Sequence, residues 1–195
     1  MDVFEAIKKR RAIRQYRPDP VSREDILAVL DAANRAPSAM NRQQWEFVVV
    51  TGEKICKMGE SFCAIMKEYT KNRDISPMRG SLTRNDFLQF ALTYGSAPVV
   101  IVVLTDADPL PNMQKANLES ASAAMENLLL AATARGLGTC WMTGPLQDGA
   151  TLHRILDIPD TKEIVAVTPL GHPLIIPGPP SRLDPDLTQK VRWVE

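Results

Sequence analysis

Several common catalytic chemistries lack their residues in this 195-residue sequence. The only histidines are His153 and His172, and the three cysteines, Cys56, Cys63 and Cys140, show no C-x-x-C spacing. Such scattered residues support neither a disulfide framework nor a zinc site, and we expect no metal.

Three catalytic and nucleotide-binding motifs are also missing. The pair Gly136-Leu137-Gly138 follows a predicted helix rather than a strand and has no third glycine, so it is not a dinucleotide fingerprint. Neither a GxxxxGK phosphate loop nor a G-x-S-x-G elbow occurs. The chain offers no clear nucleophile or acid–base pair, so in an enzyme a cofactor would carry the chemistry.

The charge balance and hydropathy exclude other classes. Lysine plus arginine equals aspartate plus glutamate at 23 each, which argues against nucleic acid as the main partner. There is no run of about 18 apolar residues, so we expect no membrane span.

Residues 1–5 (MDVFE) lack the regions of a signal peptide, and we expect a reducing, cytoplasmic location. The length favours a single domain over residues 1–195.

Periodicity and capping signals predict alternating helices and strands. Asp2 with Glu5 forms a plausible capping box for a first helix that ends near Lys9, with Val3, Phe4 and Ile7 as its apolar stripe. Further helices are expected from Ser22 to the stop at Pro37, and at 54–69, 115–135 and 148–156. Strands are expected at 45–51, 98–104, 139–142 and 164–170. Residues 70–90 have no clear assignment, and the proline-rich tail should be extended. The pattern indicates an α+β or α/β layered domain with one central sheet.

Cations gather where the first helix ends. Arg10, Arg11 and Arg14 continue a basic run that begins at Lys8. One interpretation is a charged cap that complements the helix dipole. The other is an anion site, where guanidinium groups bind a phosphate bidentately.

Three later segments carry groups suited to a flat polar ligand. The loop APSAMNRQQW holds Pro37, Ser38, Asn41 and Gln43, which could hydrogen-bond a heteroaromatic ring or simply form a turn. In GTCWMTGP, Thr143 precedes Gly144, where the backbone can approach a ligand closely. A lone Arg182 in the proline-rich tail could bring a further cation, or could be a solvated surface residue.

In this order and spacing, the segments RRAIR, APSAMNRQQW, GLGTCWMTGP and IVAVTPLGHP with the tail arginine resemble the nitroreductase superfamily of FMN proteins. The resemblance covers almost the whole chain. It implies an α+β three-layer sandwich in which helices wrap a mixed central sheet, assembled as an interlocked homodimer with two FMN sites at the interface. It also implies hydride transfer from NADH or NADPH through flavin N5 to nitroaromatics, quinones or similar acceptors, with no obligatory catalytic side chain.

The resemblance assigns roles residue by residue. Arg10, Arg11, Ala12 and Arg182 would lie near the FMN phosphate, and Arg14 near the ribityl chain and the N1–O2 edge. Thr143 and Gly144 would follow the N5–O4 edge. The loop that reaches the flavin from the partner subunit would contribute Pro37, Ser38, Asn41 and Gln43.

This chain departs from the family at two of these segments. Ala12 stands where a serine is common, which removes one hydroxyl contact to the phosphate. Gln44 stands where a proline is frequent before the tryptophan, and we expect it to loosen the loop. Residues 53–95 and 106–116 match no family pattern and should line the substrate side.

Alternative functions stay open from the sequence. One is a more specialised reductase, a flavin-fragmenting enzyme, or a dehalogenase whose lid would draw on Glu68, Tyr69 and Lys71. Another is a non-catalytic FMN-binding or redox-sensing protein, and a structural dimer without flavin is a further alternative. The choice between NADH and NADPH cannot be made from the sequence.

Overall fold

The fold is built on one four-stranded antiparallel sheet in a computed structural model that describes residues 1–74 and 83–195. The strands are β1 (Trp45–Val50), β2 (Val99–Asp106), β3 (Gly138–Thr139) and β4 (Lys162–Gly171). Their order in the sheet is β1-β2-β4-β3. A parallel bridge joins Ala12 to Thr139 at the β3 edge, so the predicted mixed character is limited to that contact.

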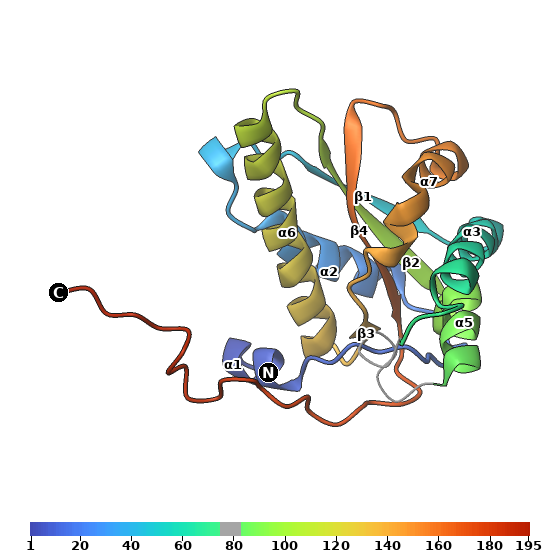
Figure 1. Cartoon of the computed structure of the whole chain (residues 1–195), viewed down its shortest axis with the longest axis horizontal. Helices are drawn as coiled ribbons and strands as arrows, with labels where there is room; N and C mark the ends of the chain where they lie inside the picture. Colours follow the sequence, from blue (N-terminus) through green and yellow to red (C-terminus); the bar gives the residue numbers. More distant parts are fainter. Residues whose placement is uncertain (75–82) are drawn as a thin grey trace.

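Helices cover both faces of the sheet, as Figure 1 shows. The helices α2 (Arg23–Asn34) and α6 (Pro111–Ala134) pack on one face. The helices α3 (Glu53–Tyr69), α5 (Arg84–Thr93) and α7 (Gly149–Leu156) pack on the other. The helix α1 (Val3–Lys9) lies beside the carboxyl end of α6. This arrangement is the predicted α+β sandwich.

Strand alternation separates two hydrophobic cores. Along β2, Val99, Ile101 and Val103 face α2 and α6, whereas Val100, Val102 and Leu104 face the other layer. Both sides are apolar because both faces of the strand are buried. On β4, a bulge opposite Val103 and Leu104 turns two consecutive residues, Val165 and Ala166, toward the same core.

Local signals explain most helix boundaries. The Asp2 side chain accepts from the backbone N–H of Glu5 at 2.9 Å in the predicted capping box, and Ser22 caps α2 in the same manner. The 24-residue α6 has a proline at its start, where a missing N–H costs nothing. It ends before Gly136, whose φ of +75° needs a glycine.

The structure corrects one predicted strand and adds detail at two other segments. The predicted strand at 139–142 is only the short β3, followed by a bridge from Met142 to Val167, because the chain turns away after Thr139. The stripe of Val3, Phe4 and Ile7 is exposed rather than buried, and only Ala6 of α1 is in the core. The 70–90 stretch, which had no assignment, contains the first seven residues of α5; residues 75–82, which also belong to the expected substrate-side segment, lie outside the described residues.

Candidate functional site

The cationic 10–16 segment runs from the end of α1 along the edge of β3. The backbone N–H of Ile13 donates to the Thr139 carbonyl at 2.8 Å, which continues the Ala12–Thr139 bridge. Gly138 permits this close approach, because a Cβ there would lie 2.8 Å from an Ile13 side-chain carbon. The path of the chain therefore carries Arg10, Arg11 and Arg14 past the end of the sheet.

Two of these arginines share one electrostatic environment. Burial raises the pKa of the Cys140 thiol, and the guanidinium groups of Arg14 and then Arg10 oppose that rise. Arg14 also lines one cavity together with Cys140, the residue that follows β3. Each of the two arginines is half-buried, so the charges sit where a ligand could displace water from them.

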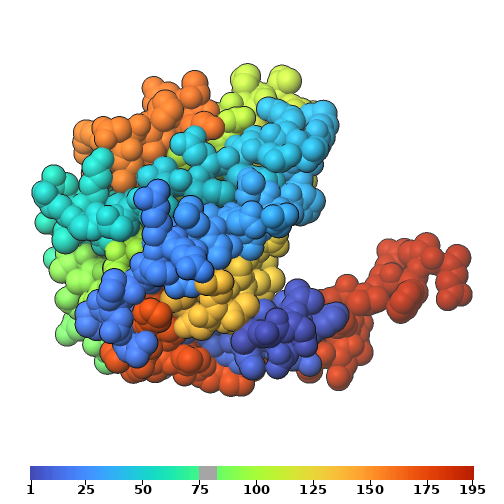
Figure 2. Space-filling model, turned by 180° about the vertical axis from the view of Figure 1, so that it is seen from behind, coloured from blue at the N-terminus to red at the C-terminus, as the bar shows by residue number. Residues whose placement is uncertain are grey.

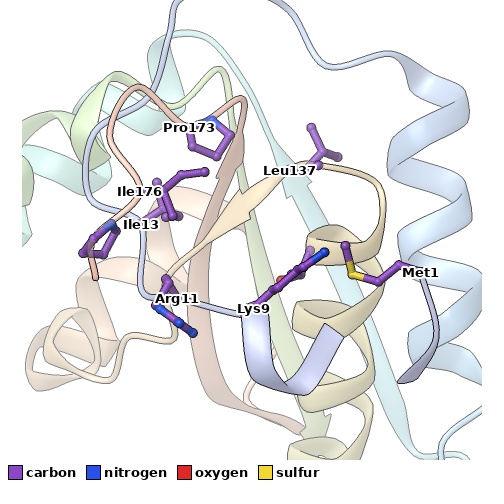
Figure 3. A pocket seen from close by; sticks show the side chains of 10 residues that line it. Met1, Lys9, Arg11, Ile13, Leu137, Pro173 and Ile176 are labelled. Carbon is purple, nitrogen blue, oxygen red and sulfur yellow. The ribbon is translucent and has the colours of Figure 1, made fainter. Parts of the chain in front are cut away.

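Arg11 faces elsewhere. Its guanidinium donates to the carbonyls of Lys8 and Arg10, at 2.7 and 2.8 Å, as a cation at a helix carboxyl end is expected to do. Figure 3 shows Arg11 and Lys9 beside a cavity of about 360 Å³ between α1, the end of α6 and the start of the tail. The three arginines therefore do not act together. Arg11 caps the carboxyl end of α1, which is the first of the two interpretations of the basic run. In residues 1–74 and 83–195, no ion pair neutralises Arg10 or Arg11.

Arg14 meets the predicted Thr143–Gly144 segment in a second cavity, of about 130 Å³, which we call the aromatic cavity. The remaining lining comes from α3, α5 and the chain after β3, namely Phe62, Met66, Phe87, Phe90, Cys140, Trp141 and Met142. Gly144 is required here for packing, because a Cβ would lie 2.8 Å from a ring carbon of Phe62. Arg14 also lines a neighbouring hollow of about 190 Å³.

The aromatic cavity is the part of the site that the sequence reasoning missed. Its α5 side depends on a capping box in which Thr83 and Asp86 exchange hydrogen bonds, followed by Phe87 and Phe90 at helical spacing. That pattern is visible in the sequence and could have located the helix. The position of α5 against Phe62 of α3 could not have been read from it.

The predicted loop of Pro37, Ser38, Asn41 and Gln43 lies far from these arginines. It surrounds the short helix η1 (Ala39–Asn41), beside the amino-terminal half of α6, while α1 lies beside the carboxyl end. Figure 2 shows the same separation from behind, with the light-blue region in the upper part of the molecule and the dark-blue α1 in the lower part. One chain therefore does not gather all the predicted site residues.

Within this loop the side chains bond to one another. Ser38 Oγ accepts from the backbone N–H of Gln43 at 3.0 Å, and Gln43 Nε2 donates to Asn41 Oδ1 at 3.0 Å. The expected loosening at Gln44 is wrong. Its side chain is buried and donates to Asn117 of α6 at 2.9 Å, so it anchors the loop.

Arg182 lies in an extended tail that runs away from the body of the molecule in Figure 1. The tail exposes Leu183, Trp193 and Val194, with exposed fractions of 97%, 85% and 79%. Arg182 is exposed. The tail thus extends beyond the core, one of the two placements expected for it.

Two kinds of feature, a metal cluster and a membrane-spanning helix, were searched for in the described part of the chain. No group of three histidine, cysteine or acidic residues in it could hold a metal ion. None of its helices is both long enough and apolar enough to cross a membrane.

Several known proteins are similar to this chain in sequence and in fold. The family model described as "Nitroreductase family" matches residues 7–172. A putative NADH dehydrogenase/NAD(P)H nitroreductase of Methanothermobacter thermautotrophicus is 34% identical, over 99% of this chain and 88% of its own length. A nitroreductase family protein from Clostridium novyi NT has a TM-score of 0.68 at 28% identity, covering 89% of this chain and 86% of that one.

A solved iodotyrosine deiodinase, with FMN and 3-iodo-L-tyrosine bound, has a TM-score of 0.78 at 25% identity, covering 93% of this chain and 95% of that one. The similarity therefore reaches relatives with different named activities. With the family match over most of its length and the α+β sandwich in common, the chain belongs to the nitroreductase family.

Proposed function

We propose that this chain is an FMN-dependent oxidoreductase that passes hydride from NADH or NADPH to a nitroaromatic, a quinone or a similar acceptor. The observation that carries the proposal is the meeting of Arg14 with the Thr143–Gly144 segment in a cavity with aromatic walls. Bound FMN would supply the chemistry at its N5, as the carrier of hydride between the nucleotide and the acceptor. Positioning is then the main task of the protein.

The residues present fit a flavin. FMN joins a phosphate to a flat ring, and this chain places two cations, Arg10 and Arg14, on either side of the Ala12–Thr139 bridge. We assign the phosphate to Arg10, Arg11, the backbone N–H of Ala12, and Arg182. Arg14 is assigned to the N1–O2 edge, where a guanidinium stabilises developing negative charge. The backbone of Thr143 and Gly144 is assigned to the N5–O4 edge.

A second copy of the chain would complete the site. The loop of Pro37, Ser38, Asn41 and Gln43 is too remote to reach a flavin held by Arg14 of the same chain, so we propose that it serves the site of a partner. Apolar side chains exposed on α1 and on the tail support a homodimer, because such surface is costly in water. They are Val3, Phe4, Ile7, Leu174, Ile175 and Ile176. We further propose that residues 1–195 form one domain and that the protein is cytoplasmic.

A more specialised reductase or dehalogenase is the alternative of the same class. Its lid would draw on Glu68, Tyr69 and Lys71. Here Arg73 stacks 4.4 Å from the centroid of the Tyr69 ring, and none of the three lid residues lines the aromatic cavity. A non-catalytic FMN-binding protein would differ from the proposed enzyme only in that it does not turn over NADH or NADPH.

The first test is the absorbance spectrum of the purified protein, followed by anaerobic addition of NADH or NADPH. Flavin bands that bleach and then return with a nitroaromatic or quinone are expected. A flavin that stays oxidised with both nucleotides would favour the binding role. Absence of flavin after reconstitution with FMN would refute the proposal.

Arginine variants then test the assignments. Each charge-assisted hydrogen bond contributes roughly 1.5–3 kcal/mol, so Arg10→Ala, Arg14→Ala and Arg182→Ala should each weaken FMN binding by about tenfold or more. Arg154→Ala is the matched control, because Arg154 is exposed on α7 and donates to Thr151. Full flavin retention in Arg10→Ala and Arg182→Ala would exclude the phosphate assignment. Light scattering of the native protein should give the mass of a dimer, about twice 21.6 kDa.

A further inference from the structure

The loop from Ser38 to Gln43 has a demanding backbone. Met40, Asn41 and Gln43 have φ values of 53°, 53° and 50°. These values lie in the left-handed region, which residues other than glycine adopt infrequently. Such conformations persist only where surrounding contacts impose them. The loop side chains assigned to the flavin therefore depend on whatever holds this backbone.

The end of the loop is held by Gln44. Its side chain is 5% exposed, and Nε2 donates to Asn117 Oδ1 at 2.9 Å. Its backbone carbonyl also accepts from the N–H of Asp106 at 3.3 Å. Asn117 is fully buried, and its own Nδ2 donates to the Asp106 carbonyl at 3.0 Å. Gln44 is thus fixed to β2 by its backbone and to α6 by its side chain.

The start of the loop is held one helical turn further along α6. The backbone N–H of Ala39 donates to Ser120 Oγ at 3.1 Å, and that hydroxyl donates to the Ala116 carbonyl at 2.6 Å. Asn117 and Ser120 are three residues apart and so lie on the same helix face. One face of α6 therefore grips both ends of the strained segment.

The buried Gln44 amide stabilises the fold less well than an apolar side chain at the same position would. The Oε1 atom of Gln44 is buried and accepts no hydrogen bond within residues 1–74 and 83–195. A buried polar group that is only half satisfied costs free energy that an apolar side chain would not. A polar anchor at this cost points to a geometric requirement.

We propose that Gln44 and Asn117, with Ser120, are positioning residues that hold the loop of Ser38, Asn41 and Gln43 in its flavin-binding shape. They act through the loop and do not touch the cofactor. The inference rests on the proposed function, since it requires that this loop contacts FMN.

The test is a double-mutant cycle on the full-length chain, with Gln44→Leu, Asn117→Leu and the double variant. FMN affinity is measured by quenching of flavin fluorescence on titration into flavin-free protein, alongside the visible circular dichroism of bound flavin. Each single change should weaken binding by about tenfold, the effect of losing one well-placed hydrogen bond. Asn117→Leu also removes the hydrogen bond from Nδ2 to the Asp106 carbonyl, so the double variant should bind as weakly as Asn117→Leu alone and not a further tenfold more weakly, because the Gln44–Asn117 bond is already lost in either single variant.

Gln114→Leu is the matched control on the same helix. Gln114 is a half-buried amide that accepts from the backbone N–H of Asp108 at 2.7 Å and donates to Glu163, away from the loop. It should lower the melting temperature as the other changes do, while FMN affinity and the dichroism stay at wild-type values. A purely structural role for Gln44 and Asn117 would give them the same profile as this control and would overturn the inference.

Two further comparisons separate the possible failures. Ser120→Ala suits the alanine-rich α6 and removes the Ala39 contact together with the hydrogen bond from the hydroxyl to the Ala116 carbonyl within the helix. If the leucine variants do not fold, it tests the proposal by an about threefold loss of affinity. Unchanged affinity in Ser120→Ala would then count against the inference. If the wild-type protein binds no FMN, the proposed function fails. If it binds FMN and Gln44→Leu binds it equally, only the positioning inference fails.

Discussion

The contact between α3 and α5 makes Gly59 the most tightly packed glycine among residues 1–74 and 83–195. A Cβ at this position would lie 1.8 Å from the carbonyl oxygen of Leu92 and 2.7 Å from its carbonyl carbon, where Cβ contacts below 3.0 Å essentially never occur. Both atoms belong to the backbone, so no side-chain rotation relieves the clash. The two helices would have to separate by about 1 Å, well beyond what close-packed interiors absorb.

Two opposing effects act in Gly59→Ala. Replacing a glycine inside a helix favours folding by about 1 kcal/mol. Overpacking against a fixed backbone costs about 1–3 kcal/mol or more, and the shortfall here is large, so we expect a net loss of about 2 kcal/mol. For a chain of this length the melting temperature should fall by about 4–8 °C.

The separation should also be felt in the site, because α3 supplies Phe62 and Met66 and α5 supplies Phe87 and Phe90 to the aromatic cavity. Gly149→Ala is the matched control, since a Cβ at that helical glycine meets nothing within 4 Å. Thermal melts followed by far-UV circular dichroism should show Gly149→Ala unchanged or raised and Gly59→Ala lowered. A melting temperature for Gly59→Ala at or above the wild-type value would refute the helix contact itself.

Two buried tyrosines and one helix cap give further expectations. The Tyr94 hydroxyl is buried without a hydrogen-bond partner in the described residues, so Tyr94→Phe should leave the melting temperature unchanged or raise it by a few degrees. By contrast, the Tyr16 hydroxyl donates to the Ile13 carbonyl at 2.8 Å, and Tyr16→Phe should cost about 1 kcal/mol in a denaturant titration. The pKa of Asp148 is lowered, chiefly by the 2.8 Å hydrogen bond from Ser61 Oγ and also by the capping of α7. Because its folded-state pKa is depressed, its contribution is full above the ordinary value near 3.9 and is lost as pH falls through the folded value. The melting temperature of Asp148→Asn should therefore be lower at pH 7 and approach that of the wild type below about pH 4; a pH-independent gap would contradict this origin.

Signals carried by a few neighbouring residues were readable from the sequence. The pair Asp2 and Glu5 predicted where the first helix begins, and the apolar run that ends at Leu104 predicted a central strand. The structure confirms both predictions. Such features depend on local hydrogen bonding and on apolar periodicity, which do not require knowledge of the rest of the chain. The order of the motifs was likewise enough to identify the family.

Features that depend on which element lies opposite were not readable. The apolar residues of α1 satisfy helical periodicity, yet they are exposed, because periodicity defines a face without naming what covers it. A glutamine at position 44 suggested a looser loop, whereas Asn117, 73 residues away, makes it an anchor.

The sequence by itself determined the layered α+β fold, most element positions and the family, because these follow from local propensity, periodicity and motif order. Only the tertiary structure separated Arg11 from Arg14, placed the 37–44 loop at the opposite end of α6, and closed Phe62 against Phe87 and Phe90 into a cavity. These outcomes depend on contacts between residues distant in the chain, whose partners are chosen by packing and not by neighbouring residues.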